Sequence, residues 1–265
     1  MIKQAVKAVL PAPTLAAARD VRDIVLAEPE WRLSEKGQRS RARLEQLRDS
    51  HRGERCFILG NGPSLQRTDL TRLRNEFTFG LNRIYLLFEA LGFHTTFLAA
   101  ENEHVVRQFA CDILTTTCQV FMSWRCRRLV PMAPNLAFFR TRAPGGFNGD
   151  ALKPIREGAT VTFIAMQLAY HMGFRDVILV GVDHHFVTSG PPGAVVTSQG
   201  ADPNHFDPRY FGRGIRWELP DLDHSELNYH VAKAAYESDG RQIRDATIGG
   251  KLTVFPKVDY DSLFA

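Results

Sequence analysis

The sequence lacks the cysteine patterns of metal-binding and disulfide-rich proteins. Only four of its 265 residues are cysteine, and their spacing matches no zinc-ligand pattern. Cys56 lies in an apolar run that reads as a buried strand. We therefore expect reduced structural thiols and a cytoplasmic protein. The four positions are Cys56, Cys111, Cys118 and Cys126.

Long hydrophobic runs are also missing. No apolar stretch approaches the roughly 20 residues that a membrane-spanning helix needs. Lys3, Lys7 and Arg19 interrupt the apolar residues near the N-terminus, which argues against a secretion signal. Two alternatives remain for residues 1–26. They form either a basic amphipathic helix that contacts the inner membrane peripherally, or an ordinary helix packed on the domain.

The charge pattern excludes further classes. The net charge of +4 is mild, and no stripe of Lys and Arg is interleaved with aromatic residues, so nucleic acid is not an expected partner. Hydrophobic content of 44% and charged content of 23% are ordinary for a globular protein. The positive balance fits an anionic small molecule such as a nucleotide, and it also fits no special ligand.

The segment Cys56–Leu65 is the most informative one that is present. A short apolar run ends at Gly60-Asn61-Gly62-Pro63-Ser64, which is typical of a buried strand that leads into a tight, phosphate-facing turn. Glycines without a Cβ would let backbone N–H groups face an anion. No Walker lysine comes after the turn, and Leu65 stands where a dinucleotide motif has its third glycine. The alternative is a plain strand-to-helix turn.

Beyond this turn, apolar runs alternate with helical patterns. The alternation predicts an α/β fold, a Rossmann-like and mostly parallel sheet with helices on both faces. Residues 1–52 are expected to form an N-terminal helical extension, and residues 53–265 the catalytic domain with a lid at about 186–223, rich in Pro, Gly, Asp and His. The strands are predicted at 55–59, 77–81, 96–100, 118–123, 136–140, 177–180, 243–246 and 252–255, and the main helices at 105–113, 160–172 and 226–236.

Small polar residues follow four of the predicted strands. Asn61, Asn82, Asn102 and Asp183 each stand at or just beyond a strand's carboxyl end. Ligands of parallel α/β sheets bind at that edge, so these residues predict a lined cleft. Asn and Asp also favour turns for local reasons, which is the competing interpretation.

These motifs together resemble the Campylobacter-type bacterial sialyltransferases. The resemblance rests on the Gly60–Leu65 turn, the strand ending at Asn82, Thr160 before a long apolar helix, Gly181-Val182-Asp183, and His205 in Asn-His-Phe. It covers roughly residues 55–215. The same opening motif is found in a broader set that includes archaeal enzymes producing 6-hydroxymethyl-dihydropterin diphosphate.

The resemblance implies an inverting, metal-independent transfer of a sialic-acid-like or other ulosonic acid from a CMP-activated donor to a glycan or lipid-linked acceptor. It implies that His205 is the general base, and that Gly60, Asn61 and Gly62, with Ser64, lie by the donor phosphate. It places Asn82 and Asn102 at the nucleotide end of the donor, and Thr160 and Asp183 along the cytidine and ribose. No cofactor is implied beyond the donor.

The sequence departs from that family at the leaving phosphate. The family has two tyrosines there, whereas this chain has His185 at one position and no tyrosine at the other. Val161 replaces the family's serine. Tyr210 and Arg213 on the lid are candidate replacements, and we hypothesise that one of them, or His185, stabilises the phosphate.

Other interpretations stay open. Asp183-His184-His185 with another histidine could form a metal cluster, and Asp221-Leu222-Asp223 matches the Asp-x-Asp pair of many sugar-nucleotide enzymes, although a solvated loop is the alternative there. A diphosphokinase using ATP and magnesium on a pterin alcohol is a second candidate function. A non-catalytic nucleotide- or glycan-binding protein is a third, and a homo-oligomer is compatible with each.

Overall fold

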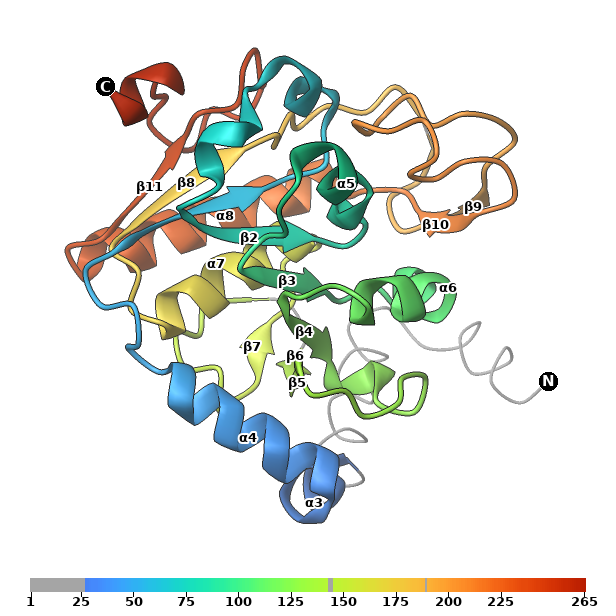
Figure 1. Ribbon diagram of the computed structural model, residues 1–265, viewed down its shortest axis with the longest axis vertical. Coiled ribbons are helices and arrows are strands. Elements are labelled where there is room, and N and C mark those ends of the chain that lie inside the picture. Colours follow the sequence, from blue (N-terminus) through green and yellow to red (C-terminus); the bar gives the residue numbers. More distant parts are fainter. Residues whose placement is uncertain (1–26, 143–144, 189) are drawn as a thin grey trace.

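The computed structural model describes residues 27–142, 145–188 and 190–265. The membrane-surface helix considered for residues 1–26 lies outside these ranges. Within them, no helix is long and apolar enough to cross a membrane. Figure 1 shows the described chain as a sheet with helices packed around it and a long loop excursion at one corner.

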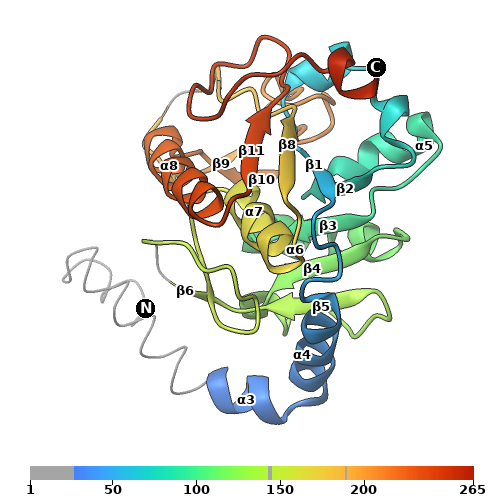
Figure 2. The same ribbon diagram turned by 90° about the vertical axis from the view of Figure 1, so that its left-hand side faces the viewer.

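A seven-stranded sheet forms the centre of the protein, in the order β11-β8-β1-β2-β3-β4-β5. Every neighbouring pair is parallel, and Figure 2 shows the strands side by side. The α/β class and its parallel sheet are therefore confirmed. The strands are β1 (Arg55–Leu59), β2 (Phe77–Leu81), β3 (Phe97–Ala100), β4 (Gln119–Ser123), β5 (Leu136–Phe139), β8 (Asp176–Val180) and β11 (Gln242–Asp245).

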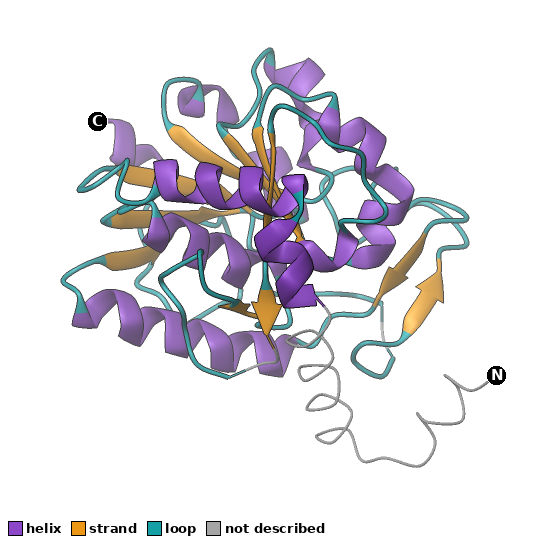
Figure 3. Cartoon of the chain, turned by 90° about the horizontal axis from the view of Figure 1, so that it is seen from below, coloured by secondary structure: helices purple, strands orange, loops and turns teal. Residues whose placement is uncertain are grey.

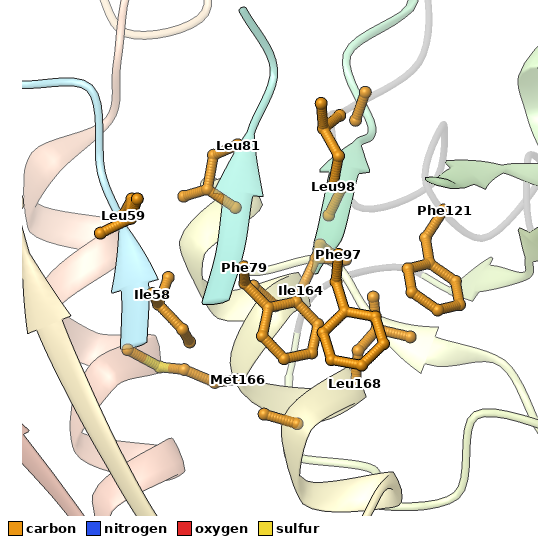
Figure 4. Packing of buried hydrophobic residues seen from close by; sticks show 14 of the residues in the cluster. Ile58, Leu59, Phe79, Leu81, Phe97, Leu98, Phe121, Ile164, Met166 and Leu168 are labelled. Carbon is orange, nitrogen blue, oxygen red and sulfur yellow. The ribbon is translucent and has the colours of Figure 1, made fainter. Parts of the chain in front are cut away.

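Continuous apolar runs form these strands because both faces of the sheet are covered. Helix α7 (Val161–His171) packs under β1, β2 and β3, and α8 (Leu222–Ser238) lies beside it against β11. Figure 4 shows Ile164 and Leu168 of α7 close to Phe79 and Phe97 in the same cluster. The Phe79 and Phe97 rings are 4.6 Å apart on neighbouring strands. The short helix α5 (Phe88–Leu91) lies on the other face (Figure 2).

The N-terminal helices cover the edge of the sheet. Helix α4 (Glu35–Leu47) packs on β5, and α3 (Glu28–Leu33) comes just before it and packs on α4 (Figures 1 and 2). The Ser40 hydroxyl of α4 accepts a hydrogen bond from the Phe138 N–H at 2.9 Å, so it satisfies an edge-strand donor. Trp31 of α3 is 1% exposed and contacts Trp124 at 5.0 Å between rings. These helices therefore share the core of the sheet.

The segment that we call the lid, residues 186–223, crosses the carboxyl ends of the strands. It holds an antiparallel pair, β9 (Val195–Thr197) and β10 (Arg216–Glu218), which Figure 3 shows apart from the main sheet. Helix α6 (Glu103–Leu114) contacts β10. The lid packs on the domain, because its aromatic side chains are buried. These are Phe206, Tyr210, Phe211 and Trp217. A further short pair joins β6 (Thr141–Arg142) to β7 (Ile155–Arg156).

One predicted strand is absent from the described residues, and one predicted boundary differs by more than two residues. The last strand expected, at residues 252–255, is wrong, because the chain makes only a single bridge between Asp245 and Lys257 there. Pro256 has no N–H to donate to a ladder, and the buried side chains of this stretch anchor a loop instead. Helix α8 begins at Leu222, four residues before the expected Glu226, because Asp221 caps it by accepting a hydrogen bond from His224 N–H at 3.0 Å.

We predict that Trp31→Ala lowers the free energy of unfolding by about 3–5 kcal/mol, because it removes a fully buried ring from the shared core. Urea denaturation followed by fluorescence and circular dichroism measures the change. Leu33→Ala in the same helix is the matched control, since Leu33 is 76% exposed, and should shift stability by less than about 0.5 kcal/mol. Equal, small effects of both variants would show that α3 is not part of the core.

Candidate functional site

A cavity of about 640 Å³ lies at the carboxyl ends of the strands. Residues within two positions of the ends of β1, β2, β3, β4 and β8 line it, and the lid supplies another wall. Most of the predicted site residues meet here. The lining includes Gly60, Asn61, Gly62, Asn82, Asn102, Thr160, Asp183, His185, His205 and Tyr210. Ser64 lies behind this surface, where it is 1% exposed.

The Gly60–Ser64 turn does not form the expected anion cradle. The N–H groups of Gly60 and Gly62 donate to the carbonyls of Val180 and Gly181, at 2.8 and 2.9 Å, so they do not face a ligand. Neither glycine has a positive φ. The chain then enters a short 3₁₀ helix, Pro63–Arg67. The turn therefore forms one wall of the cavity, and its backbone is hydrogen-bonded to the end of β8.

Close approach explains the glycines. A Cβ on Gly62 would lie 1.8 Å from the Asp183 carboxylate, and a Cβ on Gly60 would lie 2.3 Å from the Gly181 carbonyl oxygen. The Asp183 carboxylate accepts hydrogen bonds from the Ser64 hydroxyl at 2.6 Å and the Ser64 N–H at 3.2 Å. Ser64 and Asp183, which the sequence predicts separately as site residues, thus form one unit that fixes the turn, and Asp183 stays at the cavity surface.

Asn61 and Asn82 line the cavity, and each holds a side-chain acceptor that is buried and unpaired within the described residues. The Oδ1 atoms of both are buried, and neither has a partner among the described residues. Asn82 also has a positive φ of 50°, a backbone conformation that Asn tolerates better than most residues. Buried unpaired acceptors are costly in a folded protein, so both side chains are held at a cost in stability.

Asn102 and Thr160 cap helices. Asn102 Oδ1 accepts from the N–H groups of His104 and Val105 at the start of α6, and its Nδ2 donates to Glu218 of the lid at 2.9 Å. The Thr160 hydroxyl accepts from Thr162 N–H at the start of α7. Their chief structural role is to place helix ends at the cavity.

Three of the described helices begin at this cavity. First-turn residues of α6, α7 and α8 line it, and these helices contain 12, 11 and 17 residues. Each helix N-terminus carries a partial positive charge of about half an elementary charge. Side chains supply little positive charge, because Arg125 is the one Lys or Arg in the lining of the described residues. Five carboxylates also line it: Glu101, Glu103, Glu157, Asp183 and Glu218.

His205 is held by a buried carboxylate. Its Nδ1 is 2.7 Å from Asp202 Oδ2, and the Asp202 side chain is 1% exposed. Burial raises the pKa of Asp202, but the His205 hydrogen bond and charge, with the N–H groups of Asn204 and Phe211, outweigh it and lower that pKa overall. The pairing orients the ring, and Nε2 has no partner among the described residues.

Aromatic packing fixes the plane of the same imidazole. The His205 ring stacks on Tyr210 with 4.1 Å between centroids and an interplanar angle of 7°, and Phe211 contacts its edge at 5.0 Å. The lid is joined to the first turn here, since Phe206 N–H donates to the Asn61 carbonyl at 2.9 Å. These contacts leave the ring little freedom except to face the cavity, whose surface it forms.

The three leaving-phosphate candidates lie in different places. His185 is exposed and lines the cavity. Tyr210 is fully buried beneath His205, and burial raises the pKa of its phenol far above the ordinary value. Arg213 is exposed and is not part of the lining.

Neither metal site considered from the sequence is present as a preformed cluster in the described residues. Among residues 27–142, 145–188 and 190–265, no three His, Cys, Asp or Glu side chains are grouped as metal ligands. Asp221 is the N-cap of α8, so the expectation of a solvated loop at 221–223 is wrong.

Sequence reasoning missed Asp202 and Arg83. Asp202 stands three residues before His205, and that spacing is the signal that could have found it. Arg83 directly follows Asn82 and is 7% exposed. Its guanidinium donates to the carbonyls of Arg209 and Tyr210 and lies 3.8 Å from the Phe109 ring centroid, so it holds the lid near His205.

Comparisons with known proteins identify a similar fold. No protein-family model and no curated protein matches the chain. Among solved structures, it is similar to the MAf glycosyltransferase from Magnetospirillum magneticum AMB-1, with a TM-score of 0.50 and 14% sequence identity. The match covers 84% of this chain and 38% of that protein, so the chain spans well under half the length of the protein it matches. At this identity the likeness concerns the fold.

We predict that Asp202→Asn removes a pH-dependent part of the protein's stability. Because the folded pKa of Asp202 lies below its ordinary value of 3.8, its contribution is complete above that pH and is lost as the pH falls through the folded pKa. The stability difference between wild type and variant, about 1–3 kcal/mol near neutrality for a charge-assisted hydrogen bond, should therefore shrink below about pH 4. Urea midpoints measured down to about pH 2 test this. A constant difference would contradict the pairing.

Proposed function

We propose that the protein is a glycosyltransferase that moves an acidic sugar from a CMP-activated donor to a hydroxyl of a glycan or lipid-linked acceptor. The reaction is inverting and needs no metal. The observation that carries the proposal is the Asp202–His205 pair at the wall of the cavity, with 2.7 Å between carboxylate and ring. The fold likeness to a glycosyltransferase and the resemblance of the sequence motifs support the same reaction class.

His205 has the arrangement of a general base. With Nδ1–H donating to Asp202, Nε2 carries a lone pair that can accept the acceptor's hydroxyl proton. In the reaction, the acceptor oxygen bonds to the anomeric carbon as the bond from that carbon to the phosphate oxygen breaks. The bonding electrons leave with the phosphate, and the hydroxyl proton passes to His205. Asp202 is a positioning residue that stabilises the resulting imidazolium.

The three helix N-termini are the features of the cavity that would attract an anionic donor, because most of the charged side chains in the lining are carboxylates. The dipoles of α6, α7 and α8 point their positive ends at the cavity, where they attract phosphate and carboxylate groups. At about 640 Å³ the cavity falls within the roughly 300–1,000 Å³ typical of small-molecule sites. We assign the nucleoside to the side of Asn82, which lines the cavity and whose side-chain amide suits the exocyclic amine of cytosine or the ribose hydroxyls.

Thr160 and Asp183 complete the assignment. Both residues line the cavity, and the Asp183 carboxylate is part of the lining although it also accepts a hydrogen bond from Ser64. A carboxylate after a strand suits a ribose diol. In the diphosphokinase alternative, acidic side chains would have to bind magnesium, but Asp221 already caps α8.

Thermal-shift measurements with nucleotides test the donor class. We predict that CMP raises the melting temperature without magnesium, because a ligand that binds the native state stabilises it by mass action. CDP, UDP, GDP and ATP are the comparison set, each with and without magnesium. A shift with ATP that requires magnesium, and none with CMP, would overturn the CMP proposal and favour the diphosphokinase.

The His205→Ala variant tests the base. Transfer from CMP-N-acetylneuraminic acid to an alcohol acceptor should fall about 10²–10⁴-fold, since the variant cannot take the hydroxyl proton. Azide has no proton to lose, so transfer to azide should be nearly unchanged.

The exposed His230→Asn in α8 is the control and should leave both reactions unaltered. Equal loss of both reactions in His205→Ala would assign His205 a structural role. No transfer by the wild type to either acceptor would contradict this donor.

A further inference from the structure

A second histidine–carboxylate pair lines the same cavity. His184 follows Asp183 after β8, and its Nε2 is 3.0 Å from Glu226 Oε2 in the second turn of α8. The imidazole is nine-tenths buried, with 10% of its side chain exposed, and it belongs to the cavity lining. Nδ1 has no partner among the described residues. One ring nitrogen is therefore fixed, and the other is available to a ligand.

The backbone at His184 is strained. Its φ is +53°, in the left-handed region that non-glycine residues rarely adopt. Four described non-glycine residues have positive φ, and three of them, Asn82, Ala159 and His184, line the cavity. Strain of this kind gathers at functional sites because it fixes side chains where a ligand needs them.

Stability does not account for this pair. Glu226 is 41% exposed, and ion pairs between partly exposed groups contribute little to stability. Left-handed backbone costs free energy at any residue other than glycine. A neutral turn with Gly or Asn at position 184 would meet the needs of the fold, so the histidine and its carboxylate call for another explanation.

The surroundings of His184 suit a phosphate. Helix α8 is 17 residues long, and its first-turn residues Leu222, His224 and Ser225 line the cavity with His184. The positive end of this helix and an N–H group at Nδ1 of His184 would together face an anion. The cavity offers no lysine for this task among the described residues, and its guanidinium, Arg125, is already paired with Glu157.

We propose that His184, held by Glu226, donates a hydrogen bond from Nδ1 to the phosphate of the nucleotide, both in the bound donor and as the phosphate leaves. This inference rests on the proposed function and assigns the phosphate subsite within it. His184 transfers no proton. While the bond to the anomeric carbon breaks, the Nδ1–H group stabilises the charge that develops on the phosphate oxygen. The Nε2–H group meanwhile stays hydrogen-bonded to the Glu226 carboxylate.

The test compares the binding of CMP and cytidine, which differ by the phosphate, by isothermal titration calorimetry. The ratio of the two dissociation constants measures how much the phosphate contributes. In His184→Asn, whose side chain tolerates the left-handed backbone, this ratio should fall about tenfold or more, while cytidine affinity stays the same. Glu226→Gln should lower the ratio by less, because the ring keeps a neutral hydrogen-bond partner.

The exposed His230→Asn is the matched control and should leave the ratio at the wild-type value. An unchanged ratio in His184→Asn, or equal weakening of CMP and cytidine, overturns this subsite and leaves the proposed function standing. If the wild type binds neither ligand, the CMP proposal itself falls, and the subsite falls with it.

Discussion

The position of the lid depends on the buried Arg83 guanidinium. It donates hydrogen bonds to the carbonyls of Arg209 and Tyr210, and the Arg83 backbone N–H donates to the Tyr210 hydroxyl at 3.4 Å. A buried cation is costly unless several acceptors surround it, so these carbonyls must stay in place for the charge to be tolerated. Tyr210 is thereby fixed beneath His205, and the position of the ring that faces the cavity depends on a residue at the end of β2.

A second constraint links the lid to the first turn. Gly62 has no side chain, so the Asp183 carboxylate can reach Ser64, and Asn61 then offers its carbonyl to Phe206 N–H. Three distant parts of the chain are therefore joined at the cavity: the turn after β1, the turn after β8, and the lid. The turn after β1 is bonded to the turn after β8, and the lid is bonded to the turn after β1. These bonds let segments without regular secondary structure form a defined site.

The sequence predicts the sheet well because its strands are continuous apolar runs bounded by turn residues. The ranges expected for β1 and β2, 55–59 and 77–81, are the ones observed. The strand expected at 252–255 fails because apolar residues can anchor a loop as well as a ladder. The polar residues that follow the strands line one cavity, as expected because the carboxyl ends of parallel strands lie at the same edge of the sheet.

The roles within that cavity are harder to predict, because they depend on partners far along the chain. The sequence favours exposed N–H groups at the glycines of the first turn, yet those groups bond to carbonyls at the end of β8, over 100 residues away in sequence. His184 and Glu226 are similarly separated, and only folding of α8 onto the turn after β8 joins them. The one local pair, Asp202 and His205, is within reach of sequence reasoning.

The carboxylates of the cavity bear on which anion it accepts. Helix dipoles attract any phosphate, but their partial charges are fixed and small, whereas five carboxylates repel each added negative charge. A triphosphate carries more charge than a single phosphodiester, and phosphates beyond the first turn of a helix gain little attraction from its dipole, so without a metal to neutralise them they meet mainly repulsion. We therefore expect the proposed donor, with one phosphate at one helix end beside a paired imidazole, to suit these opposing fields better than a triphosphate does.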